Sequence, residues 1–275
     1  AVSAGDGVVY VRLSSANTGF PALLDIPIVK SGTETSLTPV GTGPYQVSSD
    51  EEGVCLTAHT GWWAGASLPV DRIGLSSARD RETVLYQFSS HDIQLITADL
   101  TGTDPITATG NISYQDADTT ILQYVGINTR REPFQDAAVR QALGLGINRP
   151  TLVSAVLSGH ARAAQFPVSP VSALYPAELE TLYAYDDFSA AMEAAGLTSG
   201  QTRTVTMLVN SENSFKVAAA ESIAEALSDF DLQIQVQALP WEEYTAALAA
   251  GNFDLYYGEV KLTADWDLSA LVGTG

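Results

Sequence analysis

The sequence predicts an α/β fold that is strand-rich over residues 1–122 and alternates strands with helices over residues 123–275. In the first part, apolar and polar residues alternate in short runs separated by Gly, Pro and Asp clusters, as in half-buried strands. In the second part, such runs alternate with Ala-rich amphipathic segments, the pattern of β-α-β units. We therefore expect two domains, with the boundary between them near residues 116–120.

Alternation in the first part predicts five strands, at residues 8–13, 54–58, 72–75, 93–96 and 121–127. The clearest helix there covers residues 80–88. Asp80 stands at its start, where a carboxylate caps the free amides of the first turn. Most of the connecting loops are long.

The second part begins with helices predicted at residues 135–145 and 150–157, the latter capped by Asn148. A helix over residues 188–195 has Asp186 or Asp187 as its cap, and Gly196 as its left-handed stop. Strands then follow at residues 204–209, 232–238 and 253–260, with helices at residues 215–227 and 240–249 between them. This β-α-β-α-β order predicts right-handed crossovers and an open, parallel or mixed sheet.

The charge balance excludes one class of partner. Lys and Arg number 13 against 32 Asp and Glu, a formal net charge of −19. Such a chain repels a polyanion, so we expect no nucleic-acid partner. The acidic residues are spread over both halves, which indicates a solvated acidic surface.

Cys55 is the only cysteine, which excludes an internal disulfide and a cysteine metal cluster. No apolar run approaches the roughly 18 residues of a membrane span. The first residues lack the basic and apolar regions of a signal peptide. We expect a soluble chain, from which an export or anchoring segment could have been removed.

Common enzyme motifs are absent, among them G-x-S-x-G, H-E-x-x-H and the P-loop. The histidines His59, His91 and His160 lie far apart beside loop signals, which favours surface or capping roles over catalysis. No His/acid pair has helical ligand spacing with a third ligand nearby. The sequence therefore predicts no metal site and no cofactor.

Two aromatic residues and one arginine have competing interpretations. Trp62 and Trp63 form either a ligand-facing platform or a pair that packs a loop, and packing is favoured because large aromatics mostly supply buried area. Arg140 lies four residues after Asp136, so we expect an ion pair along the helix.

An acidic loop at residues 259–267 follows the last predicted strand. Ligands of open α/β sheets collect at the carboxyl ends of strands, so Glu259 and Asp265 are placed to hold a cation or an ammonium group. The alternative is a polar loop in which Asp265 caps the next turn. Position alone leaves both open.

Several segments occur in the order of a known family. They are Pro-Val-Gly-Thr-Gly-Pro-Tyr-Gln-Val at residues 39–47, Trp-Trp at 62–63, Pro-Val-Asp-Arg-Ile at 69–73, Tyr-Val-Gly-Ile-Asn-Thr at 124–129, Val-Arg-Gln-Ala-Leu at 139–143 and Ala-Asp-Trp at 264–266. Together they resemble the family 5 extracellular solute-binding proteins of ABC importers, the oligopeptide-, dipeptide- and nickel-binding group. The resemblance covers nearly the whole chain.

The resemblance implies a two-lobed periplasmic-binding-protein fold that closes on its ligand by hinge motion. It also implies an internal fragment of a longer, exported and lipid-anchored bacterial protein. Residues 1–122 would be part of lobe one, and residues 123–275 would be lobe two, truncated before its return to lobe one. An apolar surface would then be exposed where the missing parts pack.

Site residues come from the same resemblance. In peptide-binding relatives an aspartate in an Ala-Asp-aromatic context pairs with the α-amino group of the ligand, and Asp265 followed by Trp266 matches it. The expected ligand-binding residues are Asp265, Trp266, Glu259, Trp62 and Trp63. The nickel branch uses a histidine of the second lobe, and none follows His160, which disfavours nickel.

The resulting hypothesis is a monomeric, non-catalytic binding protein that captures a peptide-like solute between its lobes and delivers it to an ABC permease. One alternative is a secreted hydrolase that uses Glu259 and Asp265 as a carboxylate pair. Another is a sensory receptor for the same solutes. The sequence does not predict the identity or length of the ligand.

Overall fold

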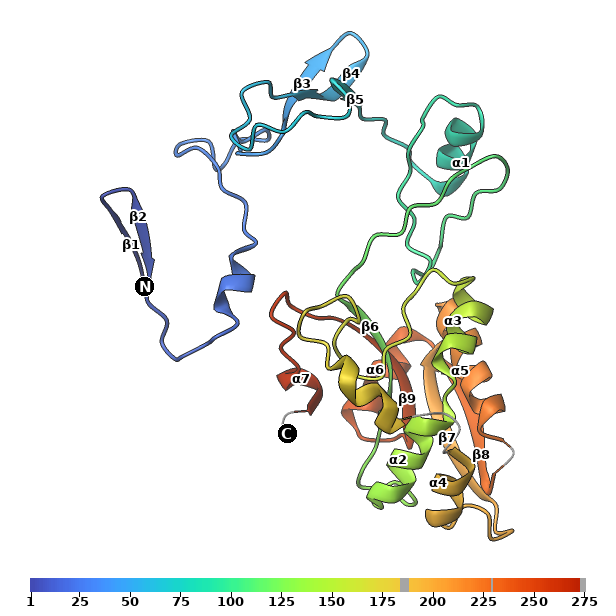
Figure 1. Ribbon diagram of the computed structural model, residues 1–275. Coiled ribbons are helices and arrows are strands. Elements are labelled where there is room, and N and C mark those ends of the chain that lie inside the picture. Colours follow the sequence, from blue (N-terminus) through green and yellow to red (C-terminus); the bar gives the residue numbers. More distant parts are fainter. Residues whose placement is uncertain (184–187, 229, 273–275) are drawn as a thin grey trace. The chain divides into compact units, whose positions relative to one another are not determined.

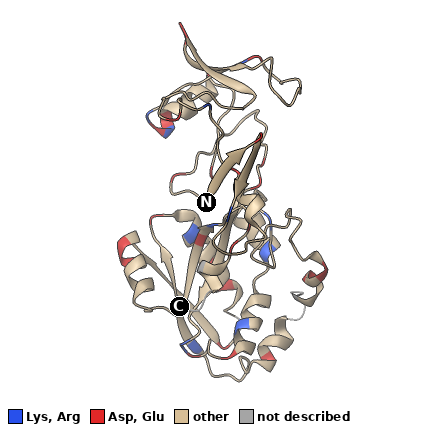
Figure 2. Cartoon of the chain, turned by 90° about the vertical axis from the view of Figure 1, so that its left-hand side faces the viewer, with Lys and Arg blue, Asp and Glu red and all other residues tan. Residues whose placement is uncertain are grey.

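The computed structural model describes residues 1–183, 188–228 and 230–272. The chain forms two compact units, Ala1–Thr97 and Ala98–Gly275, which are described separately (Figure 1). Acidic residues are scattered over helices and loops of both units (Figure 2). Within the described ranges, no helix has the length and apolar character needed to cross a membrane.

The first unit holds two small antiparallel sheets. Strands β1 (Val2–Gly5) and β2 (Val8–Val11) form a hairpin, and β3 (Tyr45–Asp50), β4 (Gly53–Ala58) and β5 (Arg72–Gly74) pair in that order. The hairpin turns through Asp6 and Gly7, both at positive φ, which matches the right-handed twist of its strands. All residues of β1 and β2 are exposed.

One predicted helix and three predicted strands of this unit are confirmed. Helix α1 (Arg81–Ser89) follows Asp80, whose carboxylate accepts from the Thr83 amide at 2.8 Å. The strand expected at residues 93–96 is wrong. The Ile93 amide donates to the Gln87 carbonyl of α1, and residues 93–96 pair with no strand. Alternation does not predict β1 or β3, because β1 contains Ser, Ala and Gly and β3 contains two Ser residues.

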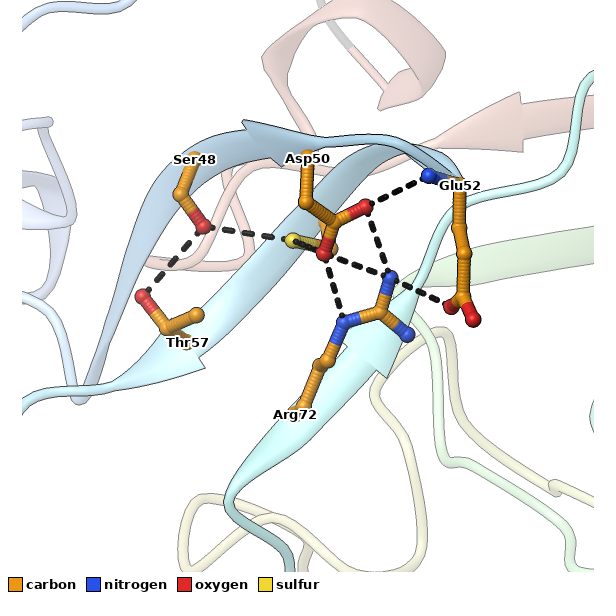
Figure 3. A network of polar contacts seen from close by, with 6 residues as sticks. Ser48, Asp50, Glu52, Thr57 and Arg72 are labelled. Atoms are coloured by element: carbon orange, nitrogen blue, oxygen red, sulfur yellow. Dashed lines mark hydrogen bonds and ion pairs between the residues drawn. The ribbon is translucent and has the colours of Figure 1, made fainter.

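A polar network joins β3 to β5 across β4 (Figure 3). The Arg72 guanidinium donates to both carboxylate oxygens of Asp50, with Nη2 2.8 Å from Oδ2, and lies 2.9 Å from Glu52. The buried Cys55 thiol lies 3.2 Å from the Ser48 hydroxyl and donates to Asp50 at 3.5 Å. The two-point contact fixes the register of β5, the shortest strand of this sheet.

This network predicts a pH dependence. Hydrogen bonds from Arg72 hold the pKa of Asp50 below its usual range. Because the pKa of Asp50 is lower in the folded than in the unfolded state, its ionised carboxylate stabilises the fold at pH values above the unfolded pKa of about 3.9. This stabilisation is lost as the pH falls through the folded-state pKa. We expect Arg72→Gln to raise the pKa of Asp50 toward that ordinary value in a carbon-13 NMR titration. Arg12→Gln, at an exposed position, serves as control, and an unchanged Asp50 pKa in Arg72→Gln would contradict the assignment.

The second unit is built on a four-stranded mixed sheet with the order β6-β9-β7-β8. Its strands are β6 (Ile121–Ile127), β7 (Arg203–Asn210), β8 (Leu232–Leu239) and β9 (Leu255–Lys261). Strand β7 runs parallel to β8 and β9, whereas β6 is antiparallel to β9. The predicted mixed α/β arrangement is therefore confirmed. The lobe boundary expected between residues 122 and 123 falls inside β6 and stays a prediction.

Helices of the second unit are α2 (Ala137–Gly146), α3 (Arg149–Leu157), α4 (Phe188–Ala194), α5 (Ser214–Ala226), α6 (Trp241–Ala249) and α7 (Ser269–Val272). The expected cap at Asn148 is confirmed, since its side chain accepts from the Thr151 amide. Gly196 has φ +69°, the expected left-handed stop. The expected caps Asp186 and Asp187 lie outside the described residues.

The main core lies between one face of this sheet and helices α2, α4 and α5. Its fully buried members include Phe134, Met192, Met207, Leu232 and Leu255. Helix α2 comes close enough to its neighbours that a Cβ on Gly146 would clash with the side chains of Phe188 and Leu227. This position therefore requires glycine.

Two glycines shape the β6–β9 pair. Gly126 lies opposite Tyr256, and Gly258 lies opposite Tyr124. Each glycine leaves the space that the facing tyrosine ring occupies, and the two hydroxyls meet at 3.2 Å. Burial and this contact raise the pKa of Tyr124 above its ordinary value. The pairing register of β6 is thus fixed by ring packing as well as by the backbone ladder.

Candidate functional site

The parallel strands of the second unit end at one edge of the sheet. Strands β7, β8 and β9 finish at Asn210, Leu239 and Lys261, so the segments that follow them emerge together. In open α/β sheets this carboxyl edge is where ligands bind. We call the segments 210–216, 239–241 and 259–267 the carboxyl edge.

The turn from β7 into α5 is held by buried amides. Asn213, 2% exposed, caps α5 by accepting from the Lys216 amide at 3.0 Å, and its Nδ2 donates to the Thr101 carbonyl at 2.8 Å. Asn210 accepts from the Glu212 amide at 3.1 Å. These side chains satisfy the backbone of the turn, which makes it a rigid support.

Glu259 has partners on both sides. Its carboxylate lies 3.3 Å from the Lys216 ammonium group and accepts from the Gln123 side chain on β6. The Lys216 side chain is only 16% exposed. The charge of Glu259 is therefore compensated within the unit. The carboxylate pair that a hydrolase would form from Glu259 and Asp265 gains no support from this arrangement.

Asp265 follows β9 in a tight turn. Leu262 anchors the turn, because its amide donates to the Thr120 carbonyl at 3.0 Å while the Thr120 hydroxyl donates to the Leu262 carbonyl at 2.7 Å. The Thr263 hydroxyl donates to Asp265 Oδ1 at 2.6 Å, and the Trp266 amide donates to the Thr263 carbonyl. Trp266 has φ +56°, in the left-handed region, and its indole is half-buried.

The capping role considered for Asp265 belongs to another residue. Asp267 Oδ1 accepts from the Ser269 amide at 2.9 Å, at the start of α7. Asp265 instead lies half-buried with its carboxylate fixed by Thr263. Asp265 therefore lies at the carboxyl edge, in the turn that follows β9.

Trp62 and Trp63 belong to the first unit. Both indole N–H groups donate to the Thr42 carbonyl, at 3.1 and 3.2 Å, and the rings meet edge to face. Trp62 is half-buried, in agreement with the packing interpretation, whereas Trp63 is 80% exposed. Trp63 is thus an exposed aromatic ring whose indole N–H is hydrogen-bonded.

Other predicted contacts differ. Arg140 donates to the carbonyls of Phe134 and Gln135 at 2.7 and 2.9 Å, because Asp136 already caps α2 by accepting from the Ala138 amide. The helical ion pair expected between Arg140 and Asp136 is therefore wrong. Within residues 1–183, 188–228 and 230–272, no group of three or more His, Cys, Asp or Glu is arranged to hold a metal ion.

Sequence reasoning missed Lys216, Gln123 and Asn213. The run Asn-Ser-Glu-Asn-Ser at residues 210–214 directly follows a strand and contains a helix cap, which is a usable turn signal. The partners of Glu259 come from β6 and α5, far away in the sequence, and no local signal identifies them.

The second unit is an open α/β sheet with the Asp265 carboxylate at its carboxyl edge, which makes that edge the candidate ligand-binding site. The model of the bacterial extracellular solute-binding proteins, family 5 middle, matches residues 3–271. The chain belongs to this family. The resemblance seen in the sequence is thereby confirmed.

Three similar proteins illustrate the match. The oligopeptide-binding protein AppA of Bacillus subtilis is 23% identical, with 84% of this chain and 44% of AppA covered. The glutathione-binding protein GsiB of Shigella flexneri is 26% identical, with 88% and 49% covered. The crystal structure of a nickel ABC transporter protein from Bacillus halodurans has a TM-score of 0.64 at 20% identity, with 87% and 53% covered.

The chain spans about half the length of the curated relatives it matches. Its structural neighbours are two-lobed periplasmic binding proteins, which confirms the predicted fold class. The relatives are named as binding proteins, in agreement with a non-enzymatic family.

Proposed function

We propose that the protein binds a peptide or peptide-like solute through the free α-ammonium group of that solute, with Asp265 as the anchor. Trp266 would line the same site, Glu259 would act through its pair with Lys216, and Trp62 and Trp63 would offer an aromatic surface of the first unit. The bound solute is then delivered to an ABC permease.

One observation supports this proposal above the others. Asp265 is a half-buried carboxylate at the carboxyl edge, held by the Thr263 hydroxyl. Trp266, also half-buried, follows it directly in the same turn. A charge-assisted bond to an ammonium group is strongest where both partners leave water, and Asp265 suits that role.

The names of two relatives support the same class of solute. Oligopeptides and glutathione both carry a free α-ammonium group, and proteins named for binding them are similar to most of this chain. The family description places such proteins outside the cell. Export, a lipid anchor and a monomeric state complete the proposal. A sensory receptor would use the same site and would differ only in its downstream partner.

The decisive experiment compares Asp265→Asn with the wild type in the full-length protein. Trialanine, glutathione and N-acetyl-trialanine are titrated by calorimetry. Losing one partner of a desolvated charge pair costs about 2 kcal/mol or more, so trialanine affinity should fall roughly 30-fold or more. Acetylation should cost the wild type a similar factor and cost Asp265→Asn little further.

Asp267→Asn is the matched control, because it removes a neighbouring carboxylate that caps α7. Its affinity for trialanine should stay that of the wild type. Equal losses on acetylation in the wild type and in Asp265→Asn would contradict the anchor. Failure of both trialanine and glutathione to bind would contradict the peptide class.

A further inference from the structure

A pocket of about 280 Å³ opens on the helical side of the second unit, between α2 and α3 and apart from the carboxyl edge. It is lined by Ala137, Arg140, Gln141, Gly144, Arg149 and Gln165. Two of these six residues are arginines and two are glutamines, and none is acidic. Such a lining offers N–H donors and positive charge.

Both arginines are fixed by backbone carbonyls. Arg140 Nη1 donates to Phe134 and Gln135, ahead of α2. Arg149 Nη1 donates to Gly144 at 3.0 Å and to Ile147 at 3.3 Å, at the other end of α2. Each guanidinium group is thus held in place by one nitrogen. Among the described residues, the Nε and Nη2 groups of Arg140 and Arg149 make no hydrogen bond.

Arg140 and Arg149 differ from several other arginines of the chain in having no ion pair. Arg72, Arg131 and Arg162 each pair with a carboxylate. Among the residues that the structure describes, Arg140 and Arg149 have carbonyl partners and no ion pair. In a chain of net charge −19, two arginines without an ion pair on one pocket give it a positive local field.

Burial of Arg149 also favours binding of an anion. Desolvation lowers the pKa of Arg149 from its usual value. A partly desolvated guanidinium group gains more from an anion than an exposed one, since water screens their attraction less.

We propose that this pocket binds a small oxyanion, a carboxylate or a phosphate, between the guanidinium groups of Arg140 and Arg149. Gln141 and Gln165 also line the pocket. The pocket involves none of the carboxyl-edge residues, so this site is independent of the proposed solute site.

The test uses the full-length protein labelled with nitrogen-15, titrated with inorganic phosphate and separately with sodium acetate at constant ionic strength. The Nε–H signals of Arg140 and Arg149 should shift together and saturate, with a Kd of about 1 mM. Saturation by acetate alone identifies a carboxylate site, and saturation by phosphate alone identifies a phosphate site. Absence of a saturable shift with either anion would overturn the proposal.

Gln141→Glu probes the site without removing a structural bond, because residue 141 is exposed on α2. A carboxylate there competes with the ligand, so we expect about a tenfold or larger loss of anion affinity. The matched control is Gln235→Glu, at an exposed position of β8, which should bind as the wild type does. Equal affinities of the wild type and Gln141→Glu would also overturn the assignment.

Discussion

Gly146→Ala is expected to destabilise the second unit by about 2–3 kcal/mol. The added methyl group would lie well inside van der Waals contact with Phe188 and Leu227, which are 5% and 1% exposed. Neither side chain has free space to enter, and overpacking of a dense core costs on this scale. The measurement is native-state hydrogen exchange of the β7 amides, which reports opening of this sheet.

The same helix supplies the control. A Cβ on Gly144 meets nothing within 4 Å, so Gly144→Ala should be neutral or should stabilise by about 0.5–1 kcal/mol through helix propensity. Adding Phe188→Leu to Gly146→Ala should recover part of the loss. Equal effects of alanine at positions 144 and 146 would show that α2 does not approach the core as closely as described.

Leu255→Ala should cost about 3 kcal/mol. Leu255 is 1% exposed and begins β9, which lies between β6 and β7, so that it faces Ile127 of β6 and Met207 of β7. Removing its branched end leaves a cavity that three strands border, and a paired backbone cannot collapse into it. Urea unfolding together with β7 hydrogen exchange measures the loss.

Leu174→Ala is the companion variant, because Leu174 is 68% exposed in the same unit. Its effect should stay within about 0.5 kcal/mol. A loss below about 1 kcal/mol for Leu255→Ala would contradict the central position of this residue in the core.

The second unit was the more predictable part of the fold. Its strands and helices carry long, regular patterns, and the Asn148 cap and the Gly196 stop mark their ends locally. The expected strand at residues 93–96 failed because two isoleucines in a short segment resemble a strand whether or not a partner strand exists. Pairing is a long-range property that alternation alone does not contain.

The candidate site was likewise predictable only in part. The Ala-Asp-Trp segment identified Asp265 as a candidate, and the turn after β9 places it at the carboxyl edge. The ion pair and the hydrogen bond of Glu259 were not predictable, since their partners Lys216 and Gln123 belong to other elements. Asp267 rather than Asp265 caps α7, and choosing between them required the backbone path of the turn.

The antiparallel pairing of β6 with β9 has a consequence during synthesis. Strand β6 is the first strand of this sheet to leave the ribosome. Its partner β9 is complete only when Lys261 has been synthesised. At 5–20 residues per second, the wait lasts on the order of 10 s. The β7-α5-β8 segment can assemble meanwhile, whereas the uncharged run Ile-Leu-Gln-Tyr-Val-Gly-Ile at residues 121–127 has no partner strand. Until translation passes residue 261, β6 therefore exposes the backbone donors and acceptors that β9 later pairs.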